Sequence, residues 1–588
     1  MIWIISAILI LGAAVWGAST FWAMRRWSVW VAAIGVLWEV GWMVLSMIDR
    51  LVLPGMGREY VYLIGSIILF GMVIGSKRTW NLPRRIKENW KKEAVVVAVT
   101  ATVLLGAMPV LYRNGWQDGA WVAHGYYNGD TATFQALVQG SLTTPGLFQR
   151  NPFAASEELE YPTFIHGSIA TFIQALGLSE KWLVWLPWMV LGQITVTIPL
   201  MFFVYDAFNG RKGKKEYLPA TFLALVALYV LGTSWDNFIY PQSHFFLTGI
   251  FLLLAGHLAH TQTLKEPGSV RDAIVTFLLA LILIPANAVT GTAALVMVWA
   301  AYGLQVINTN NSMLTRVGFA GGVIALGAVF LGLTPGQGSL SIMPGFSYTA
   351  ALDAMKLAPI LILVFAGAGM LFRKSSVPIA IGTSLLALGL VALTFSQRDI
   401  VVANASRFWY HAVLLLWPLG AAAGWAVWHY SLSMWPSIKR NRIDRVIYAG
   451  TGLGLLALML MPVWSSVAVA YDSLLRLDEK KVSRAEVEAL RWLQKETNNE
   501  AVFAQNPDSF WSIPVFTGRT LLRTDYWLSP NDKVLADMRA AYRGDDNAQQ
   551  EMQSQVDFVW LKTDELPSWQ NVLKGKTPVF SNAEVSIY

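Results

Sequence analysis

The sequence predicts an α-helical polytopic membrane protein of about 14 transmembrane helices, with a small C-terminal extracytoplasmic α/β domain. Three observations support this fold class. Of the 588 residues, 55% are hydrophobic and only 14% are charged, whereas soluble domains carry about 25% charged residues. Apolar runs of about 20 residues, the length that crosses a bilayer, recur from the first residue to about residue 470. The loops between these runs alternate in their Lys and Arg content.

The composition excludes several classes of protein. So few charges rule out a soluble enzyme, a disordered tail protein and a fibrous repeat. The chain has no cysteine, so a disulfide framework, a thiolate nucleophile and a Cys-based zinc site are excluded as well. Its 27 Trp and 19 Tyr fit a membrane protein, because their amphipathic rings favour the headgroup level of a bilayer.

The apolar runs divide the chain into spans. We expect them at residues 2–24, 27–48, 60–75, 94–112, 182–205, 217–233, 245–263, 273–286, 292–307, 317–333, 358–372, 378–394, 408–429 and 446–471. Pro285 and the Asn-Ala-Val-Thr-Gly sequence after it predict a break between two short spans.

The loop charges orient these spans. One set of alternating loops holds roughly 22 Lys and Arg and the other roughly 8 before the tail, so the first set is expected in the cytoplasm. The first span has Arg25 and Arg26 behind it, whereas a cleaved signal peptide carries its charges in front. We therefore expect a retained span, a multi-pass protein of the cell membrane, and both termini outside. The net charge of +7 is then a signal of topology, and nucleic acid is excluded as a partner.

Three domains follow from this layout: accessory transmembrane helices at 1–93, a second transmembrane domain at 94–471 with a long outer loop at 113–181, and an extracytoplasmic domain at 472–588. The last begins with a helix whose Ser483 and Glu486 form a capping box. Strands are expected at 501–505, 520–523 and 557–561, a helix at 532–543, and a hairpin at 577–588.

The outer loop carries the first candidate for chemistry. Phe134, Leu137 and Val138 recur at helical spacing and predict an amphipathic helix over 131–142, with Asp130 at its N-cap. Asp130 either caps this helix or handles a substrate hydroxyl at the membrane surface; the two roles are compatible, and composition alone favours the cap. A second amphipathic stretch, 163–176, is expected to lie on the membrane, because a crossing there would place the later basic loops outside. The three Glu at positions 157, 158 and 160 read as a solvated face.

These features resemble the GT-C superfamily, polytopic glycosyltransferases that use polyprenyl-phosphate-linked sugars at the outer face. The outer-loop acid is followed by a D-x-x-x-F-x-x-x-V-x-x-G spacing, in which Asp130, Phe134 and Val138 match and the glycine, Gly140, comes one residue early. The resemblance covers roughly residues 94–588, including the outside domain that many bacterial members carry. It implies that Asp130 is the catalytic acid, with Asp118 as the alternative and Asn128 as a neighbouring candidate.

The resemblance also implies a second acid or a metal ligand in the next outer loop, where Asp236 and His244 match by position. A divalent metal (Mg²⁺, Mn²⁺ or Zn²⁺) would be held there, although residue 238 is Phe where the family has a second acid. His244 reads more simply as a side chain that caps the next span. In a late loop, Arg398 and Arg407 resemble the family's phosphate-binding arginines, since a guanidinium binds phosphate oxygens bidentately. Snorkelling anchors at the end of a span are the alternative.

The expected reaction is transfer of a sugar from a polyprenyl-phosphate donor to a glycan, lipid or protein acceptor, with the donor's tail among membrane lipids. Asp130 would orient and partly deprotonate the acceptor, and Arg407, Arg398 or a metal would stabilise the leaving phosphate. Three other readings compete: a polytopic transporter or lipid-linked glycan flippase, a lipid-linked polymer ligase or polymerase of the cell envelope, and a non-catalytic scaffold. Glu39 bears on the first, because ion-coupled transporters place ionisable residues near the bilayer midplane. Its alternative role is a hydrogen bond between packed helices.

Overall fold

The fold was analysed in a computed structural model. It describes residues 2–21, 26–52, 58–75, 93–101, 104–105, 115–124, 130–143, 151–155, 157, 159, 164–175, 192, 195–204, 245–262, 270–308, 411, 443, 446, 450, 479–525 and 532–588. The predicted spans between residues 309 and 471 lie almost entirely outside these ranges.

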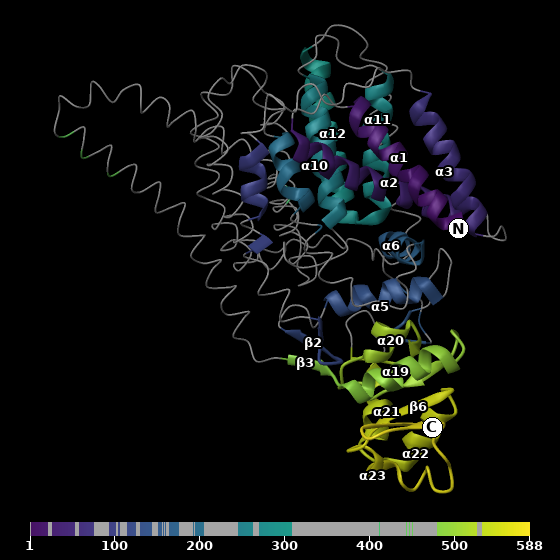
Figure 1. Ribbon diagram of the computed structural model, residues 1–588. Coiled ribbons are helices and arrows are strands. Elements are labelled where there is room, and N and C mark those ends of the chain that lie inside the picture. The colour runs from purple at the N-terminus through teal and green to yellow at the C-terminus, as the bar shows by residue number, and fades with distance from the viewer. Residues whose placement is uncertain are drawn as a thin grey trace.

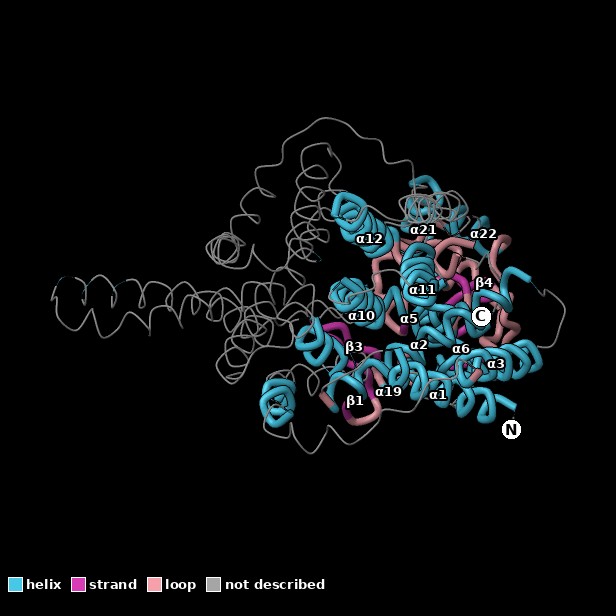
Figure 2. The backbone as a smooth tube through the Cα atoms, turned by 90° about the horizontal axis from the view of Figure 1, so that it is seen from above, coloured by secondary structure: helices cyan, strands magenta, loops and turns pink. Residues whose placement is uncertain are grey.

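Apolar helices form one end of the molecule (Figure 1). They are α1 (Ile2–Phe21), α2 (Trp27–Val52), α3 (Arg58–Ile74), α10 (Phe245–Gln262), α11 (Val270–Ala286) and α12 (Ala288–Asn308). Seen from above, α10, α11 and α12 lie close together, and α1 lies beside α3 (Figure 2). No Asp, Glu, Lys or Arg occurs in α1, α10 or α12.

Two of the described helices are long and apolar enough to cross a membrane, over Ile2–Ser19 and Trp27–Asp49. Shorter apolar helical segments lie at Glu59–Ile74, Thr195–Val204, Leu247–Ala259, Val275–Ile284 and Thr290–Ala301. The bounds of α1, α2, α3 and α10 agree with those expected from the sequence within a few residues.

The break expected after Pro285 is present. Only Asn287 separates α11 from α12, and its side-chain oxygen accepts a hydrogen bond from the Thr290 N–H at 2.9 Å, so it begins the new helix. A Cβ on Gly291 would lie 2.5 Å from the Ile284 Cα. Two residues seven positions apart approach so closely only because the chain folds back on itself, so α11 and α12 form a tight helical hairpin.

Between the apolar helices and the C-terminal part lie four elements of the predicted outer loop. These are β1 (Gly115–Gln117), β2 (Ala120–His124), α5 (Asp130–Thr143) and α6 (Phe164–Ala175). Figure 1 shows α6 beneath the apolar helices and α5 below it, running across the molecule.

The C-terminal part, residues 479–588 with a gap at 526–531, contains mixed secondary structure. Its helices are α19 (Arg484–Glu496), α20 (Ser512–Thr517), α21 (Asp532–Tyr542), α22 (Asp546–Gln553) and α23 (Leu566–Trp569), and its strands are β3 (Glu479–Val482), β4 (Val502–Ala504), β5 (Thr520–Leu521), β6 (Phe558–Lys562), β7 (Phe580–Ser581) and β8 (Val585–Ile587). Strands β4 to β8 form a sheet in the order β5-β4-β6-β8-β7. The pairings of β4 with β5 and β6 are parallel, and those of β8 with β6 and β7 are antiparallel.

Local signals in the sequence predicted several of these elements. The Ser483 side chain accepts a hydrogen bond from the Glu486 N–H at 3.1 Å, and the Glu486 carboxylate accepts one from the Ser483 N–H at 2.8 Å, which confirms the capping box. The predicted terminal hairpin is β7 and β8, with Asn582 in its turn accepting from the N–H groups of Glu584 and Val585.

Candidate functional site

Helix α5 begins at Asp130 and is buried between two other helices. It packs against α6 on one side and α20 on the other. Every side chain described from Ala132 to Ser141 is buried, including the polar Thr133, Gln135 and Gln139. The helix predicted over 131–142 is therefore confirmed, but the exposed polar face expected of it is not present, because α20 and α6 enclose the helix.

The residues of the GT-C-like spacing hold this helix in place. Phe134 is 4% exposed and stacks on His166 of α6, with ring centroids 5.1 Å apart. Val138 is 2% exposed, and Gly140 is buried. The spacing after Asp130 thus has a packing role, and Asp130 stands at the N-terminal end of the helix, where the helix dipole favours a negative charge.

Helix α6 is also enclosed. It contacts α1, α2, α5 and α11, and its described side chains, such as Ile165, Ser168 and Ile169, are buried. Its 12 residues span about 18 Å, less than the roughly 30 Å hydrocarbon core of a bilayer. The prediction that this stretch lies on the membrane rather than crossing it therefore stays a prediction. The structure places α6 beneath the apolar helices as a packed layer.

The outer loop joins the C-terminal part through one strand pairing and one further set of backbone hydrogen bonds. Strand β2 pairs antiparallel with β3, with Trp121 opposite Val482. Residues 152–155 bond to the edge strand β5: the Leu521 N–H donates to the Pro152 oxygen and the Ala155 N–H to the Leu521 oxygen, each at 3.0 Å. The loop thereby covers an edge of the sheet that would otherwise expose unpaired backbone groups.

Side chains reinforce the same interface. Trp121 is 2% exposed and packs against Phe510 and Phe516, with ring centroids 5.5 and 5.4 Å away. Gly518 ends α20 with φ of +68°, and a Cβ there would lie 2.5 Å from the Gln139 oxygen of α5. Only glycine allows both this backbone conformation and this close approach.

Two arginines are buried here: Arg523 bonds across the interface, and Arg519 bonds within the C-terminal part. Arg523, whose side chain is 1% exposed, pairs with Glu157 of the outer loop, so the solvated role expected for Glu157 was wrong. Arg519 donates to the Thr497 oxygen at 2.9 Å and to the Gln494 oxygen at 3.2 Å. Burial lowers the pKa of Arg519, and these carbonyls at the C-terminal end of α19 compensate its charge.

Asp118, the alternative acid, occupies the turn between β1 and β2. Asp118 and Gly119 have φ of +52° and +83°, and Gln117 pairs with Ala120. A two-residue loop with positive φ at both positions is a type I′ hairpin, for which Asp-Gly is a preferred sequence. That dipeptide is the sequence signal from which this hairpin could have been predicted.

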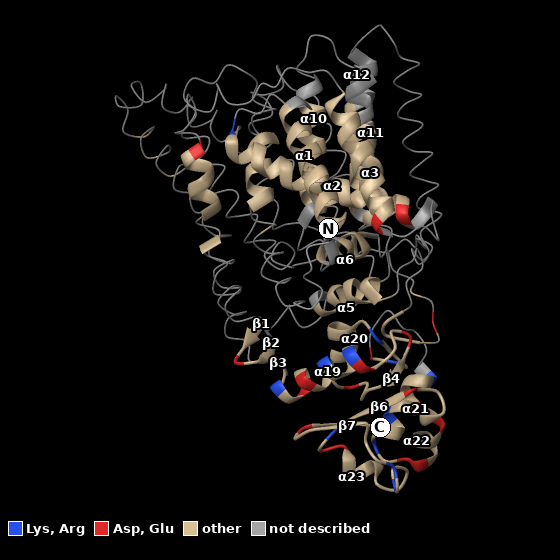
Figure 3. Ribbon diagram, turned by 45° about the vertical axis from the view of Figure 1, so that its right-hand side comes forward, with Lys and Arg blue, Asp and Glu red and all other residues tan. Residues whose placement is uncertain are grey.

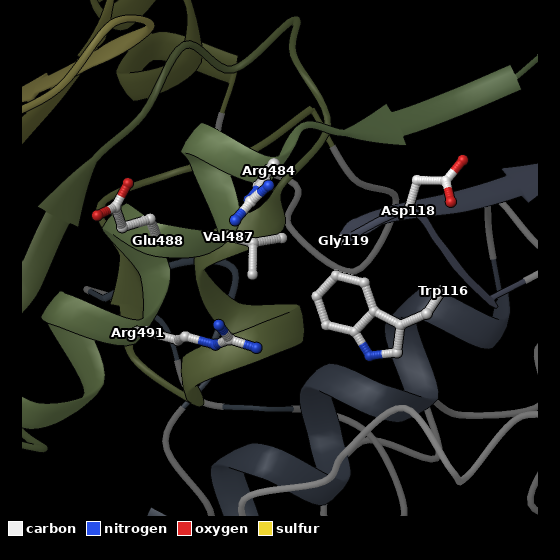
Figure 4. A pocket seen from close by; sticks show the side chains of 7 residues that line it. All are labelled: Trp116, Asp118, Gly119, Arg484, Val487, Glu488 and Arg491. Carbon is white, nitrogen blue, oxygen red and sulfur yellow. The ribbon is translucent and has the colours of Figure 1, made fainter.

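The same hairpin forms one wall of a surface cavity. The opposite wall is α19, and the cavity has a volume of about 570 Å³ (Figure 4). It is lined by Trp116, Asp118, Gly119, Arg484, Val487, Glu488 and Arg491. None of these residues except Asp118 was predicted as a site residue, because the cavity forms only when two segments distant in sequence meet.

Five of the predicted site residues lie outside the described residues: Asn128, Asp236, His244, Arg398 and Arg407. Among the described residues, no three His, Asp or Glu side chains gather closely enough to hold a metal ion. This statement does not cover the proposed metal ligands Asp236 and His244, which lie outside the described residues.

Comparison of the sequence with protein-family models and with curated protein sequences finds no match. Any assignment of function therefore rests on the residues themselves and on their arrangement.

Proposed function

We propose that this chain is a membrane glycosyltransferase of the GT-C type, moving a sugar from a polyprenyl-phosphate donor to an acceptor at the outer face. The observation that supports the proposal best is the position of Asp130. It begins a helix that lies between the apolar helices and the charged C-terminal part, which is where a lipid-borne substrate and a water-borne acceptor would meet.

The distribution of charge supports the same arrangement. Figure 3 shows most of the blue and red ribbon of charged residues on the C-terminal part, whereas α10 and α12 contain no Asp, Glu, Lys or Arg. We infer a multi-pass protein of about 14 spans whose C-terminal α/β domain stands outside the membrane. The asymmetry of Lys and Arg between alternating loops predicts which ends of the spans face the cytoplasm.

In this mechanism the acceptor hydroxyl or amide attacks the anomeric carbon, and the bond from that carbon to the phosphate oxygen breaks. Asp130 accepts the proton of the nucleophile, and the lipid phosphate leaves with the bonding electron pair. Arg398 and Arg407 are the candidates for stabilising that phosphate, because a planar guanidinium binds two of its oxygens. Asp236 and His244 would contribute if a divalent metal is used.

The test is the variant Asp130→Asn in membranes supplied with a panel of radiolabelled polyprenyl-phosphate monosaccharides. Asn caps a helix about as well as Asp, so we expect normal folding, whereas loss of the base lowers transfer by about 10² to 10⁴ fold. Asp537→Asn, an exposed position on α21, makes the same chemical change and should leave transfer intact. Full transfer activity of Asp130→Asn would remove Asp130 from the mechanism. Loss of activity in Asp118→Asn together with retained activity in Asp130→Asn would assign the role to Asp118 instead.

A transporter or flippase is the second candidate, and one observation favours it. Glu39 of α2 is 4% exposed, and its carboxylate accepts a hydrogen bond from the Ser168 hydroxyl of α6 at 3.2 Å. An acid buried in a membrane helix marks many ion-coupled pathways, although this contact equally serves to pack α6 against α2. Uptake of a lipid-linked sugar into vesicles without a covalent product would favour transport over transfer.

A further inference from the structure

The surface cavity between the β1–β2 hairpin and α19 has the features of a binding site. Its volume of about 570 Å³ falls within the range of about 300 to 1,000 Å³ found for small-molecule sites. Its lining residues come from the β1–β2 hairpin and from α19.

Local structure explains how the cavity is built. On α19, Arg484, Glu488 and Arg491 are spaced four and three residues apart and therefore share one face of the helix. Val487 lies between the two arginines as an apolar floor, and it is 2% exposed. The tight Asp-Gly turn brings the hairpin close, because a Cβ on Gly119 would lie 3.5 Å from the Arg484 Cδ.

The aromatic side of the cavity comes from Trp116. This indole is 36% exposed, and the Arg491 guanidinium carbon lies 6.0 Å from its ring centroid. Figure 4 shows the Arg491 side chain extending toward the indole ring, whereas the carboxyl groups of Asp118 and Glu488 point away from it. A ligand beside Trp116 would thus meet guanidinium groups and an aromatic face rather than carboxylates.

Three other arginines of the C-terminal part have clear structural partners. Arg519 binds backbone carbonyls, Arg523 pairs with Glu157, and Arg539 pairs with Asp508 and Asp525. Arg484 and Arg491 are exposed, and neither forms an ion pair or side-chain hydrogen bond with the described part of the chain. The first turn of α19 is closed by its own capping box, so a bound anion would be held by these two guanidinium groups.

We propose that this cavity binds an anionic sugar, that is, a saccharide unit bearing a carboxylate or a phosphate. A guanidinium fork matches either anion bidentately, and the negative face of an indole ring attracts the C–H groups on the apolar face of a sugar. Arg484 and Arg491 lie two helical turns apart, about 10 Å along the axis, which suits one or two sugar rings. The proposal does not depend on Asp130 or on transfer activity.

The test is calorimetric titration of the full chain in detergent with four probes: digalacturonate, neutral digalactose, glucose 1-phosphate and inorganic phosphate. We expect at least one anionic sugar to bind at least about tenfold more tightly than digalactose and than inorganic phosphate, because both the charge and the ring contribute. Equal binding of digalactose, equal binding of inorganic phosphate, or no binding of either anionic sugar would overturn the proposal.

Variants locate the binding. Arg491→Gln should weaken the anionic sugar at least about tenfold, and Arg491→Lys should weaken it less, since it keeps the charge and loses only the planar fork. Trp116→Leu should weaken the binding of anionic sugars while leaving the weak binding of inorganic phosphate unchanged.

Arg543→Gln is the control: it makes the same charge change at an exposed arginine beyond the end of α21. Equal affinity in Arg491→Gln and the parent chain, or equal losses in Arg491→Gln and Arg543→Gln, would contradict the assignment, and unchanged thermal unfolding of each variant excludes misfolding.

Discussion

Gly518 connects two parts of the molecule at the scale of a single residue. It ends α20 in the left-handed conformation, and its carbonyl accepts a hydrogen bond from Thr143 of α5 at 3.2 Å, across 375 residues of sequence. Any side chain here would meet both a strained backbone and the main chain of α5. The glycine therefore fixes how closely the C-terminal part approaches the helix that begins at Asp130.

Replacing Gly518 with alanine should destabilise the protein strongly. The left-handed backbone costs about 1 to 2 kcal/mol for a residue with a Cβ, and overpacking against backbone atoms adds about 1 to 3 kcal/mol. Gly575→Ala is the matched control, because Gly575 also has positive φ, at +84°, but has open space around its missing Cβ. Thermal unfolding of the full chain in detergent should show a clearly lower midpoint for Gly518→Ala than for Gly575→Ala. Equal midpoints would show that the approach to α5 carries no strain.

Residues whose partners are near in sequence were the predictable ones. Ser483 and Glu486 satisfy each other across three positions, so their capping box could be read directly. The Asp118-Gly119 turn was equally readable and was overlooked. The roles of Gly518 and Arg523 could not be predicted, because their partners Gln139 and Glu157 lie in a different part of the chain.

At the scale of elements, the outer loop behaves as part of the C-terminal fold. It contributes β1 and β2 to one sheet, extends the β5 edge of the other, and places α5 against α20. The amphipathic pattern of 131–142 predicted the helix but not its environment. The spacing of apolar residues shows which side chains share a face of the helix. It cannot show that α20 covers the opposite face, because α20 comes from a distant part of the sequence.

The pair formed by Glu157 and Arg523 should anchor this loop. Glu157→Gln removes the carboxylate partner of a guanidinium that is 1% exposed, and we expect a loss of about 2 kcal/mol. Limited proteolysis near residues 151–157 should accelerate, since the segment on β5 opens more often. Asp508→Asn breaks a pair to Arg539 in which the carboxylate is 51% exposed, and it should cost less than about 1 kcal/mol. Similar losses in both variants would mean that burial of the pair is unimportant.

The whole molecule separates an apolar end from a charged end (Figure 3). The composition of the chain predicted this separation. Hydropathy and loop charge are summed over many residues, so an error in the bounds of one span changes the prediction little. The convergence of Asp130 with Asp236 and Arg407 on one site stays a prediction, since such a meeting depends on how distant spans pack. The cavity beside α19 shows the same difficulty: its two walls come from segments that lie far apart in the sequence.

The proposed orientation in the membrane can be tested by single cysteine substitutions. The chain contains no cysteine, so each introduced thiol is the only one in the given sequence. A membrane-impermeant maleimide applied to intact cells should label Lys574→Cys, which is exposed in the C-terminal part. Lys212→Cys, in a loop predicted to be cytoplasmic, should react only after permeabilisation. Labelling of Lys212→Cys in intact cells would reverse the topology and place Asp130 on the wrong side for a lipid-linked donor.

The ion pair of Glu157 with Arg523 joins residues 366 positions apart, and this separation has a consequence for biosynthesis. Translation delivers residues 113–181 long before the segments that cover them exist, so the nascent chain must hold α5 and the unpaired segment 151–155 until the later residues are made. Only a chain translated beyond Leu521 supplies α20 and β5. A prematurely terminated chain would leave that apolar surface bare, and cellular quality control would recognise it as unfinished.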